Sequence, residues 1–212
     1  MHPGPSTESR SASLKTLLIA TSNLGKIEEL LALLADLPAN VLTPEQLGIH
    51  LEIVEDGETY AANASKKALA HARAAGLTAL ADDTGLEVVA LQGAPGLHSK
   101  RYAGRPDATD ADRRAKLLAE LRGVARPWQA AFRATIAVAS PAGDVRLSDG
   151  ACEGEIIPDE RGSGGFGYDA IFLPRGETKT IAEMSLEEKN RISHRARAVR
   201  SARQHIIEML TG

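Results

Sequence analysis

The sequence predicts an α/β fold with two lobes, built on a long mixed β-sheet that is flanked by helices. Two observations carry this prediction. An apolar run at residues 14–20 leads through a polar loop into a helical pattern over residues 26–37, which is the strand–loop–helix unit of α/β proteins. Two long runs, at residues 129–140 and 145–157, are separated by a turn and predict an antiparallel hairpin. The length of this hairpin indicates a second lobe folded against the first.

Size and composition suit one globular domain over residues 14–212, preceded by a disordered tail at residues 1–13. The net charge of -3 argues against a nucleic-acid polymer as partner. The single cysteine, Cys152, allows no intramolecular disulfide and is interpreted as a small buried residue. No apolar stretch approaches the roughly 20 residues that span a bilayer, and the tail lacks the apolar middle of a secretory signal. We therefore expect a cytoplasmic protein without a membrane partner.

A polar loop with the sequence TSNLGK, at residues 21–26, follows the first predicted strand. Amide groups at the start of the next helix, together with Lys26, can receive a phosphate there. The loop lacks the Gly-Lys-Ser/Thr ending of the common phosphate-binding loop. A strand–turn–helix junction in which Ser22 or Asn23 caps the helix has the same appearance. On this segment alone, both interpretations stay open.

The next segment, residues 40–54, predicts two short strands, the second of them at residues 50–54. An acidic turn, EDGE, follows at residues 55–58. A helix is then predicted at residues 60–75, with a threonine before it as the cap and alanines on the face that packs against a sheet. On this helix Lys67 shares a face with the asparagine one turn earlier, and taken alone it is interpreted as a surface lysine.

The stretch TALADDTG, at residues 78–85, is the strongest candidate for a functional centre. Its apolar run predicts a buried strand that ends in two acids, Asp82 and Asp83, and ligands bind beyond such strand ends in open α/β sheets. If the strand continues instead, the two carboxylates point to opposite faces, so that one reaches the crevice and the other braces it. Carboxylates combined with substrate phosphates suit a magnesium ion. A solvated acidic turn is the alternative.

Further along, the pattern predicts a strand at residues 86–91 and an amphipathic helix at residues 107–122. A glycine-rich loop at residues 161–165 leads into FGYD, residues 166–169, and then into a strand at residues 170–173. The chain has only three Phe and three Tyr, and half of these six lie in this one segment. Aromatic side chains beside glycines suit stacking on the flat ring of a base. A hydrophobic plug at the start of a strand is the alternative.

Two helices are predicted near the C-terminus. Residues 180–190 hold a short helix that Ser185 caps, with a glutamate three residues later at the spacing of a capping box. The last helix, residues 194–210, begins with His194 and Arg195. Two basic side chains at a helix N-terminus oppose the helix dipole, which indicates that an anion is bound there.

Taken together and in this order, these motifs resemble the inosine triphosphate pyrophosphatases, also called non-canonical purine NTP pyrophosphatases. The resemblance covers residues 14 to about 208. Each motif is weak by itself, whereas the ordered set is highly specific. The matching segments are TSNLGK at 21–26, EDGETY at 55–60 with Asn63-Ala64 and Lys67-Ala68, ADDTGL at 81–86, GAPG at 93–96, Ser99, RYAG at 101–104, GGFGYD at 164–169, Glu188-Lys189, and Ser193-His194-Arg195.

The resemblance implies a magnesium-dependent hydrolase that converts ITP, dITP or XTP to the monophosphate and pyrophosphate and so cleanses the nucleotide pool. It also implies an active-site cleft between the lobes and a homodimer. By position, Asp83 would be the proton acceptor and a Mg2+ ligand, with Glu55 as a weaker second ligand. The implied substrate-binding residues are Thr21, Ser22, Asn23, Leu24, Gly25, Lys26, Thr84, Phe166, Gly167, Tyr168, Asp169, Lys189, His194 and Arg195.

The charges and hydrogen-bonding groups of this implied site fit a purine nucleoside triphosphate. Lys26, Lys67, Lys189 and Arg195 would balance the roughly four negative charges of the triphosphate and form a basic pocket in an acidic protein. A 6-oxo purine presents an acceptor where adenine presents a donor, so a buried protein donor would reject ATP. That donor would be His194 or Arg195.

Two other functions stay open. One is a non-catalytic nucleotide-binding module that uses the same pocket, and the other is a related house-cleaning pyrophosphatase that acts on modified pyrimidine nucleotides. The presence of both Asp83 and Lys26 favours an enzyme over a binding module. Departures from the family pattern at Ala62, His98 and Lys100 remove no residue that is assigned to the chemistry.

Overall fold

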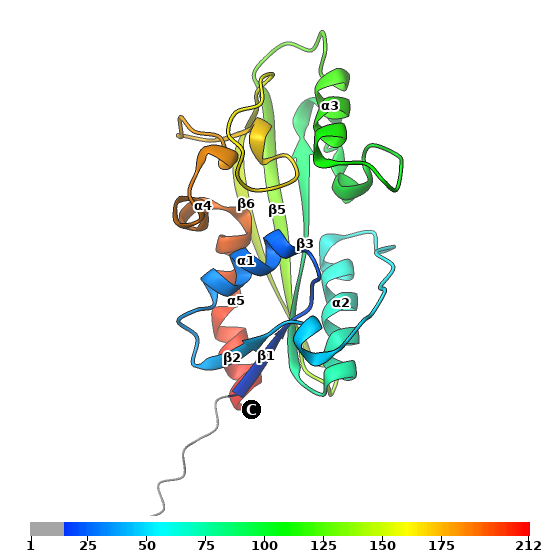
Figure 1. The fold of residues 1–212 in the computed structure, drawn as a ribbon, viewed down its shortest axis with the longest axis vertical. Coiled ribbons are helices and arrows are strands. Elements are labelled where there is room, and N and C mark those ends of the chain that lie inside the picture. The colour runs from blue at the N-terminus through cyan, green and yellow to red at the C-terminus, as the bar shows by residue number, and fades with distance from the viewer. Residues whose placement is uncertain (1–14) are drawn as a thin grey trace, which may run out of the picture.

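The computed structural model describes residues 15–212, so the tail predicted at residues 1–13 lies outside the described residues. Figure 1 shows an elongated molecule in which one mixed sheet follows the long axis and helices pack against it. The described part of the sheet has the strand order β2-β1-β3-β5-β6-β7, and β4 also pairs with β3. The strands are β1 (Lys15–Ile19), β2 (Ala39–Leu42), β3 (Thr78–Val88), β4 (Pro95–Gly96), β5 (Trp128–Ala139), β6 (Val145–Ile156) and β7 (Phe172–Pro174).

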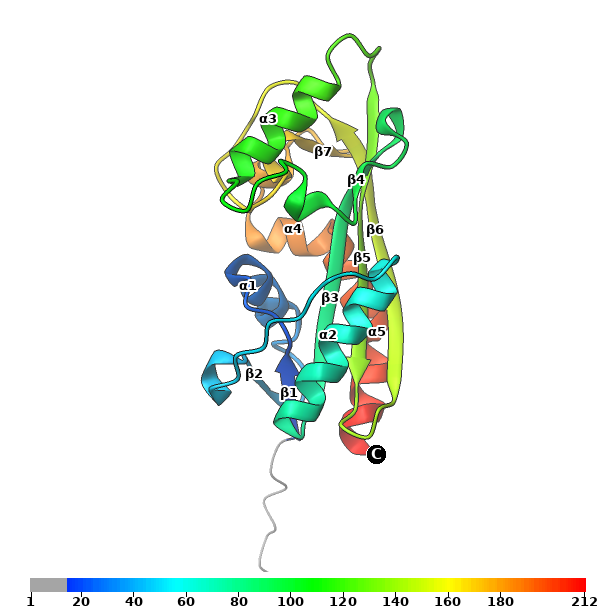
Figure 2. The same ribbon diagram turned by 90° about the vertical axis from the view of Figure 1, so that its right-hand side faces the viewer.

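Three long strands, β3, β5 and β6, run through both halves of the molecule (Figure 2). β5 and β6 form the antiparallel hairpin that the sequence predicts. The prediction of two separate strands, before and after the acidic pair, is wrong, because β3 continues from Thr78 to Val88 without a break. Each residue from Ala79 to Val88 has a partner on β5, and this pairing keeps the chain extended through Asp82 and Asp83.

The other edge of β3 changes its partner halfway along, and this change defines two lobes. β1 pairs in parallel with β3 up to Leu80, whereas β4 pairs antiparallel with it from Leu86. The first lobe carries β1, β2 and two helices, α1 (Leu24–Leu33) and α2 (Tyr60–Ala75). The second lobe carries β4, β7 and the helix α3 (Asp110–Glu120). The predicted two-lobed α/β fold is confirmed.

Both faces of the sheet are covered by helices in the first lobe. α5 (His194–Thr211) and α1 lie on one face, where large apolar side chains such as Leu30 and Ile136 are fully buried. α2 lies on the other face, and its buried side chains there are mainly alanines, including Ala64 and Ala68. Because alanine is small, the α2 backbone approaches the sheet closely, and the polar residues at neighbouring positions of the helix come near β3.

Local capping signals fix where the helices begin. The Asn23 side chain accepts a hydrogen bond from the Lys26 amide at 3.0 Å, so α1 begins at Leu24, two residues earlier than predicted. The helix also ends earlier, at Leu33, because the next residue leaves the helical conformation and turns the chain toward β2. α2 has the predicted boundaries, with Thr59 as its N-cap and a glycine in the left-handed conformation as its C-cap.

The second strand predicted within residues 40–54 does not form. Only β2 is present, and residues 49–57 have no regular secondary structure. An extended apolar segment becomes a strand only where a neighbouring strand satisfies its backbone groups. This segment instead passes beside α2 (Figure 2), where Glu55 forms an ion pair with Lys67 at 2.7 Å.

The second lobe has its own apolar core beneath α3, in which Leu117, Phe132 and Phe172 are buried. α3 spans Asp110–Glu120 instead of the predicted residues 107–122, because Thr109 and Asp112 form a capping box that starts the helix. Within the described part of the chain, no helix combines the length and the apolar character that crossing a membrane requires.

Two short segments differ from the predicted pattern in the same way. The predicted strand at residues 170–173 begins instead at Phe172, after a 3-10 turn that covers Asp169–Ile171. The helix predicted within residues 180–190 is divided into a 3-10 turn at Ile181–Glu183 and α4 (Leu186–Ile192). The capping box at Ser185, which the sequence does predict, starts α4 and separates the two.

Candidate active site

Among residues 15–212, no strand pairs with one edge of β3 between the two lobes. Pairing with β1 stops at Leu80 and pairing with β4 starts at Leu86, so residues 81–85 face the interval between these two partners. Asp82 and Asp83 lie within this interval, level with the point where the chain leaves the carboxyl end of β1. Ligands of open α/β sheets bind at such a place. The acids therefore lie where the sequence predicts a ligand, although β3 itself does not end there.

The two adjacent carboxylates serve opposite faces of β3, as the alternation of a continuous strand requires. Asp82 is buried on the α5 side, where its Oδ2 accepts a hydrogen bond from Arg195 Nε at 3.0 Å. Its Oδ1 lies 3.0 Å from Lys26 Nζ. Thr84 Oγ1 also donates to Asp82, at 2.8 Å. Asp82 therefore braces the interval from within, although its buried Oδ1 has only the ion pair with Lys26 and accepts no hydrogen bond within the described residues.

Asp83 lies on the α2 side and is more accessible than Asp82. Lys67 Nζ donates to its Oδ1 at 3.1 Å, and Asn63 Nδ2 donates to its Oδ2 at 3.2 Å. Lys67 also donates to Glu55 at 2.7 Å, so two carboxylates converge on one ammonium group. Asn63 further accepts from the Gly57 amide at 2.8 Å, which fixes the acidic turn beside the site.

Glu29 of α1 connects the remaining cations. Its Oε2 forms an ion pair with Arg195 Nη1 at 2.5 Å, and its Oε1 lies 2.6 Å from Lys189 Nζ. Lys189 in turn lies 2.7 Å from Asp169 of the second lobe. All of these groups are buried. Sequence reasoning missed Glu29, because it is one of two consecutive glutamates on an ordinary amphipathic helix and no local signal marks it.

The cations do not form the free basic pocket that the sequence predicts. Each of Lys26, Lys67, Lys189 and Arg195 has a carboxylate partner within 3.1 Å. We call these four cations and their five carboxylate partners, Glu29, Glu55, Asp82, Asp83 and Asp169, the ion-pair network. The half-exposed Arg101 also lies 3.9 Å from Glu55, and even with this fifth cation the positive charges only equal the five carboxylates, so the group carries no excess of positive charge.

The protonation equilibria of the two aspartates differ. Burial alone would raise the pKa of Asp82, but Lys26 and Arg195 outweigh it and hold that pKa well below its usual range. For Asp83, burial is the largest effect and raises the pKa above that of an ordinary aspartate, although Lys67 opposes it. Asp82 is therefore a permanent anion that braces the structure, whereas Asp83 is the more basic carboxylate.

The loop that the sequence proposes for phosphate, residues 21–26, forms the turn from β1 into α1. Asn23 caps the helix, and its own amide lies 3.2 Å from Thr21 Oγ1. Leu24 is 77% exposed at the first position of the helix, so the start of α1 is open to solvent. The capped-junction interpretation is confirmed, whereas phosphate binding at this helix N-terminus stays a prediction.

Phe166 from the second lobe packs directly on this loop. A Cβ added to Gly25 would lie 2.5 Å from Phe166 Cδ1, so only glycine leaves room for the ring. The ammonium of Lys189 lies 4.8 Å from the centre of the same ring, and the guanidinium of Arg195 lies 5.7 Å from it. Phe166 of the second lobe therefore contacts both the 21–26 loop of the first lobe and two cations of the ion-pair network.

The other residues of the FGYD segment serve structural roles. Tyr168 is part of the buried core of the second lobe, and its hydroxyl donates to the Ser99 carbonyl at 2.9 Å. Asp169 accepts from the Phe166 amide at 3.0 Å in addition to its pairing with Lys189. For Tyr168 the hydrophobic-plug interpretation is correct, whereas Phe166 is the aromatic residue that faces the interval between the lobes.

His194 and Arg195 do not form an unpaired cationic site at the start of α5. The Arg195 guanidinium binds carboxylates of the protein through Nε, Nη1 and Nη2. The His194 ring stacks on Phe132 with 4.8 Å between ring centres. Burial, followed by the charges of Arg195 and Lys189, lowers the pKa of His194 well below its usual value, so the imidazole is neutral. Its buried Nε2 has no hydrogen-bond partner among the described residues.

Glu55 and Asp83 are oxygen donors of the kind that a hard divalent cation takes. Magnesium takes one or two carboxylates and completes its shell with water and substrate phosphates. Glu55 and Asp83 already place two carboxylate oxygens around the positive charge of Lys67, at 2.7 and 3.1 Å. In the described residues, no group of three or more His, Cys, Asp or Glu side chains is arranged as a metal site. Glu55 and Asp83 therefore suit a metal that is shared with a phosphate.

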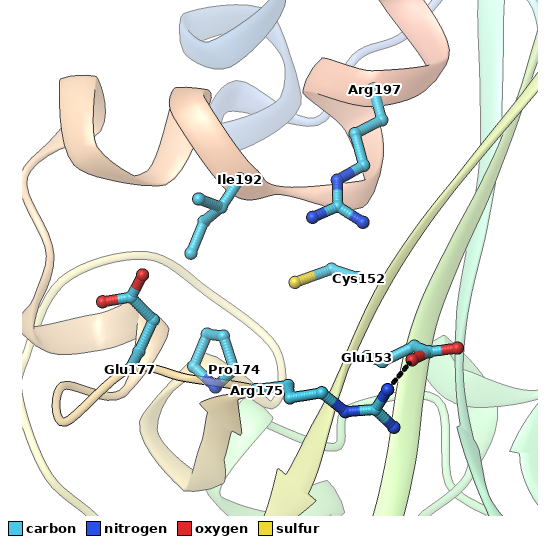
Figure 3. A pocket seen from close by; sticks show the side chains of 7 residues that line it. All are labelled: Cys152, Glu153, Pro174, Arg175, Glu177, Ile192 and Arg197. Carbon is cyan, nitrogen blue, oxygen red and sulfur yellow. Dashed lines mark ion pairs between the residues drawn. The ribbon is translucent and has the colours of Figure 1, made fainter.

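A separate surface pocket lies outside the ion-pair network (Figure 3). Cys152 lines it beside Glu153 and Arg175, which form an ion pair at 2.6 Å. The thiol is buried, and this burial raises its pKa to about 11. A cysteine with such a pKa is a poor nucleophile. The interpretation of Cys152 as a small buried residue is confirmed.

The family model described as the Ham1 family matches this sequence over residues 17–205. This match covers both lobes and every residue of the ion-pair network. The chain belongs to the Ham1 family. The shared segment therefore includes the last three residues of β1, the open interval of β3 and the start of α5, which together position the charged side chains described above.

Curated relatives of this Ham1 chain have names that state the activity implied by the motifs. A protein of Desulforamulus reducens named dITP/XTP pyrophosphatase is 46% identical over 187 residues, which are 88% of this chain and 92% of the relative. A protein of the same name from Syntrophobacter fumaroxidans is 48% identical over 194 residues, 92% of this chain and 83% of the relative. The resemblance to non-canonical purine NTP pyrophosphatases is confirmed.

Solved Ham1 structures share the fold. A HAM1 protein from Coxiella burnetii aligns with a TM-score of 0.82 and 37% identity, covering 92% of this chain and all of the other. The dITP/XTP pyrophosphatase of Mycobacterium abscessus aligns with a TM-score of 0.69 and 37% identity, covering 87% of this chain and 97% of the other. The mixed sheet with its flanking helices is thus the Ham1 fold.

Proposed function

We propose that this Ham1 chain hydrolyses the non-canonical purine nucleotides dITP, XTP and ITP to the monophosphate and pyrophosphate. This reaction removes them from the nucleotide pool. Family membership and the names of the relatives support the activity. The observation that carries the proposal is the convergence of Asp83 and Glu55 on Lys67 beside the unpaired edge of β3.

The balance of charge supports a requirement for Mg2+. A nucleoside triphosphate carries about four negative charges, and electrostatic stabilisation of phosphoryl transfer requires that they be offset. The four cations of the ion-pair network are already paired, so they do not supply this charge. Asp83 and Glu55 are the residues that would hold the ion. When bound, Mg2+ neutralises charge on the phosphate oxygens.

Asp83 is the residue placed to accept a proton from the attacking water. Asn63 and Lys67 each donate to a different oxygen of its carboxylate and so fix its orientation. Burial raises its pKa, which makes it a stronger base than a solvated aspartate. Asp82 does not suit this role, because it lies on the other face and because Lys26 and Arg195 hold its pKa well below the usual range, which makes it a weak base.

The phosphate groups are assigned to the start of α1. The first amides of a helix have no partner within the helix and, with the helix dipole, they attract anions. Asn23 satisfies the Lys26 amide, while the amides of Leu24 and Gly25 have no hydrogen-bond partner among the described residues. Lys26 follows in the same turn and lies next to Asp82.

The base is assigned to the interval between Phe166 and His194. Phe166 supplies an aromatic face, and a base can stack on it. Carboxylates bind Arg195 at Nε, Nη1 and Nη2, so most of its guanidinium is engaged within the protein. His194 is neutral, and its buried Nε2 is unpartnered within the described chain. Of the two donors that the sequence suggests, His194 is therefore the one that we assign to base selection.

The test is a substrate panel with the purified full-length chain and Mg2+. We expect dITP, XTP and ITP to yield equal amounts of pyrophosphate and monophosphate, with ATP and GTP far slower and with no turnover after chelation of the metal. Release of orthophosphate with a diphosphate would contradict the proposal. Nucleotide binding without turnover indicates a binding module, and preference for a modified pyrimidine triphosphate indicates the related house-cleaning activity.

We also infer a homodimer in the cytoplasm. The resemblance to the pyrophosphatase family supports the dimer, and the single cysteine fits a reducing compartment. Light scattering coupled to size-exclusion chromatography measures the oligomeric mass, and a monomer at micromolar concentration contradicts the first inference. Fractionation of cells that produce the natural full-length chain tests the second.

A further inference from the structure

The first two turns of α3 hold both backbone groups of Gly167, the residue that follows Phe166. Asp110 Oδ2 accepts a hydrogen bond from the Gly167 amide at 2.7 Å, and Arg114 Nη1 donates to the Gly167 carbonyl at 2.9 Å. Gly167 adopts φ +62°, a conformation that costs glycine little but gives the backbone no stiffness of its own. The two α3 side chains therefore set the direction in which the chain leaves Phe166.

Arg114 also contacts the other end of the glycine-rich loop. Its Nη2 donates to Glu160 at 2.8 Å, so one guanidinium bridges Glu160 and Gly167 across the loop. The loop between them contains Gly162 and Gly165, both at positive φ. Glycines lose more backbone freedom on ordering than other residues, so a side chain that ties both ends of such a loop has a large effect on its order.

The side chains of α3 that hold the loop are themselves held in place. Arg113 donates to Asp110 Oδ1 and to the Ala108 carbonyl at 2.5 and 2.6 Å. The capping box of Thr109 and Asp112 fixes the helix start from which Asp110 projects. The Asp110 carboxylate is therefore oriented before the loop docks on it, and α3 presents a preformed surface for Gly167.

We infer that Asp110 and Arg114 are positioning residues for base recognition, which act by placing Phe166 over the interval between the lobes. This inference rests on the proposed function, because it assigns Phe166 to the base of the nucleotide. Neither residue belongs to the ion-pair network or contacts the start of α1, so we expect their loss to weaken base recognition more than phosphate binding. Without either contact the glycine-rich loop is less ordered in the free protein. Nucleotide binding must then order the loop, and the entropy lost in doing so weakens the affinity.

The experiment compares Arg114→Met with Arg114→Lys, Asp110→Ala and a matched control, Arg105→Met. Methionine keeps the apolar length of the arginine side chain without its donors, and lysine reaches one of the two acceptors. The control removes an ion pair of the same helix start, from Arg105 to Asp112 at 2.7 Å, which does not touch the loop. For each protein, kcat and KM for dITP and the inhibition constant of the product pyrophosphate are measured.

We expect Arg114→Met and Asp110→Ala to raise KM for dITP about tenfold, which corresponds to about 1.4 kcal/mol, with kcat changed less than about threefold. The pyrophosphate inhibition constant should not change, and Arg114→Lys should be intermediate. Arg105→Met should match the wild type. A merely structural role would weaken dITP and pyrophosphate equally, and that result overturns the inference, as does an unchanged KM in both variants.

Two other outcomes are an Arg114→Met variant that does not fold and a wild type that does not hydrolyse triphosphates. If Arg114→Met loses its cooperative thermal transition, then Asp110→Ala and Arg114→Lys decide the inference by the same constants. If the wild type releases no pyrophosphate from any triphosphate, the proposed function fails instead. In that case the affinities of dITP and pyrophosphate are measured by calorimetry. Weaker binding of dITP with unchanged binding of pyrophosphate supports the role of α3, and equal weakening of both overturns it.

Discussion

Asp82 and Asp83 are adjacent in the sequence, yet their carboxylates lie on opposite faces of β3 and contact different cations. Asp82 contacts Lys26 and Arg195 on the α5 side, whereas Asp83 contacts Lys67 on the α2 side. One carboxylate is held as a permanent anion within the fold, and the other is available for chemistry. Asp82→Asn should therefore mainly lower the stability of the fold, whereas Asp83→Asn should mainly lower the turnover of dITP.

For Asp83→Asn we expect turnover of dITP to fall at least about 100-fold, because the proton acceptor is removed. The fold should persist, because Lys67 keeps Glu55 as a partner. Pyrophosphate release measures the first effect and thermal unfolding the second. Asp56→Asn is the matched control. Asp56 is an exposed acid of the EDGE turn, and it forms an ion pair with Lys66 of α2. A rate for Asp83→Asn within tenfold of the control contradicts the assignment.

For Asp82→Asn we expect a loss of stability of about 3–5 kcal/mol, the usual result of removing one partner from buried charges. The side chain of Asp82 is fully buried, and its loss leaves Lys26 without a carboxylate. Denaturant unfolding measures the change. Asp36→Asn removes an ion pair with Arg203 that is largely solvent-exposed and should leave stability nearly unchanged. Equal stability of the two variants argues against a bracing role for Asp82.

His194 should make stability depend on pH. Burial, followed by the charges of Arg195 and Lys189, lowers the pKa of the folded imidazole below 6.5, while Lys26 acts in the same direction and Asp82 opposes it. The unfolded chain therefore takes up a proton first. This contribution to stability is complete above pH 6.5 and is lost as the pH falls below it, by no more than about 1.4 kcal/mol per pH unit.

Unfolding free energies of the wild type and of His194→Gln between pH 7.5 and 5 test this dependence. The variant lacks the imidazole, so its stability should fall less steeply below pH 6.5 than that of the wild type. Parallel curves for the two proteins show that His194 is not held neutral. Because this measurement concerns folding alone, it is independent of the proposed reaction.

Contact between Gly25 and Phe166 should make these two positions interdependent. A Cβ at position 25 would lie 2.5 Å from the ring, so Gly25→Ala displaces Phe166 and should raise KM for dITP. In Phe166→Ala the ring is absent, and adding Gly25→Ala should have little further effect. A double-mutant cycle on KM measures this coupling. Additive effects of the two substitutions mean that the ring and the glycine act separately.

Elements with local signals are predicted well from the sequence. α2 has the predicted boundaries because Thr59 caps it and a glycine ends it, and both devices depend only on neighbouring residues. Ser185 starts α4 for the same reason. The long hairpin of β5 and β6 follows from two long strand-like runs separated by a short turn. These features depend mainly on residues that are neighbours in the sequence.

Features that depend on a distant partner are not predicted. The extension of β3 through Asp82 requires β5, which lies some fifty residues later in the chain. An apolar segment with no neighbouring strand, residues 50–54, stays irregular. Glu29 enters the ion-pair network only because α1 packs toward α4 and α5, which bring Lys189 and Arg195 to it. The Asp83 site itself follows from motif order, whereas its charge balance does not.

The lobes have no flexible linker between them, because β3, β5 and β6 pass through both without interruption. A pivot at one or two residues is therefore not available to this architecture. Relative movement of the lobes has to bend and twist a three-stranded ribbon while its backbone hydrogen bonds stay intact. Such a ribbon is stiff, so admission of a nucleotide depends on small, distributed changes of strand twist and on rearrangement of side chains such as Phe166.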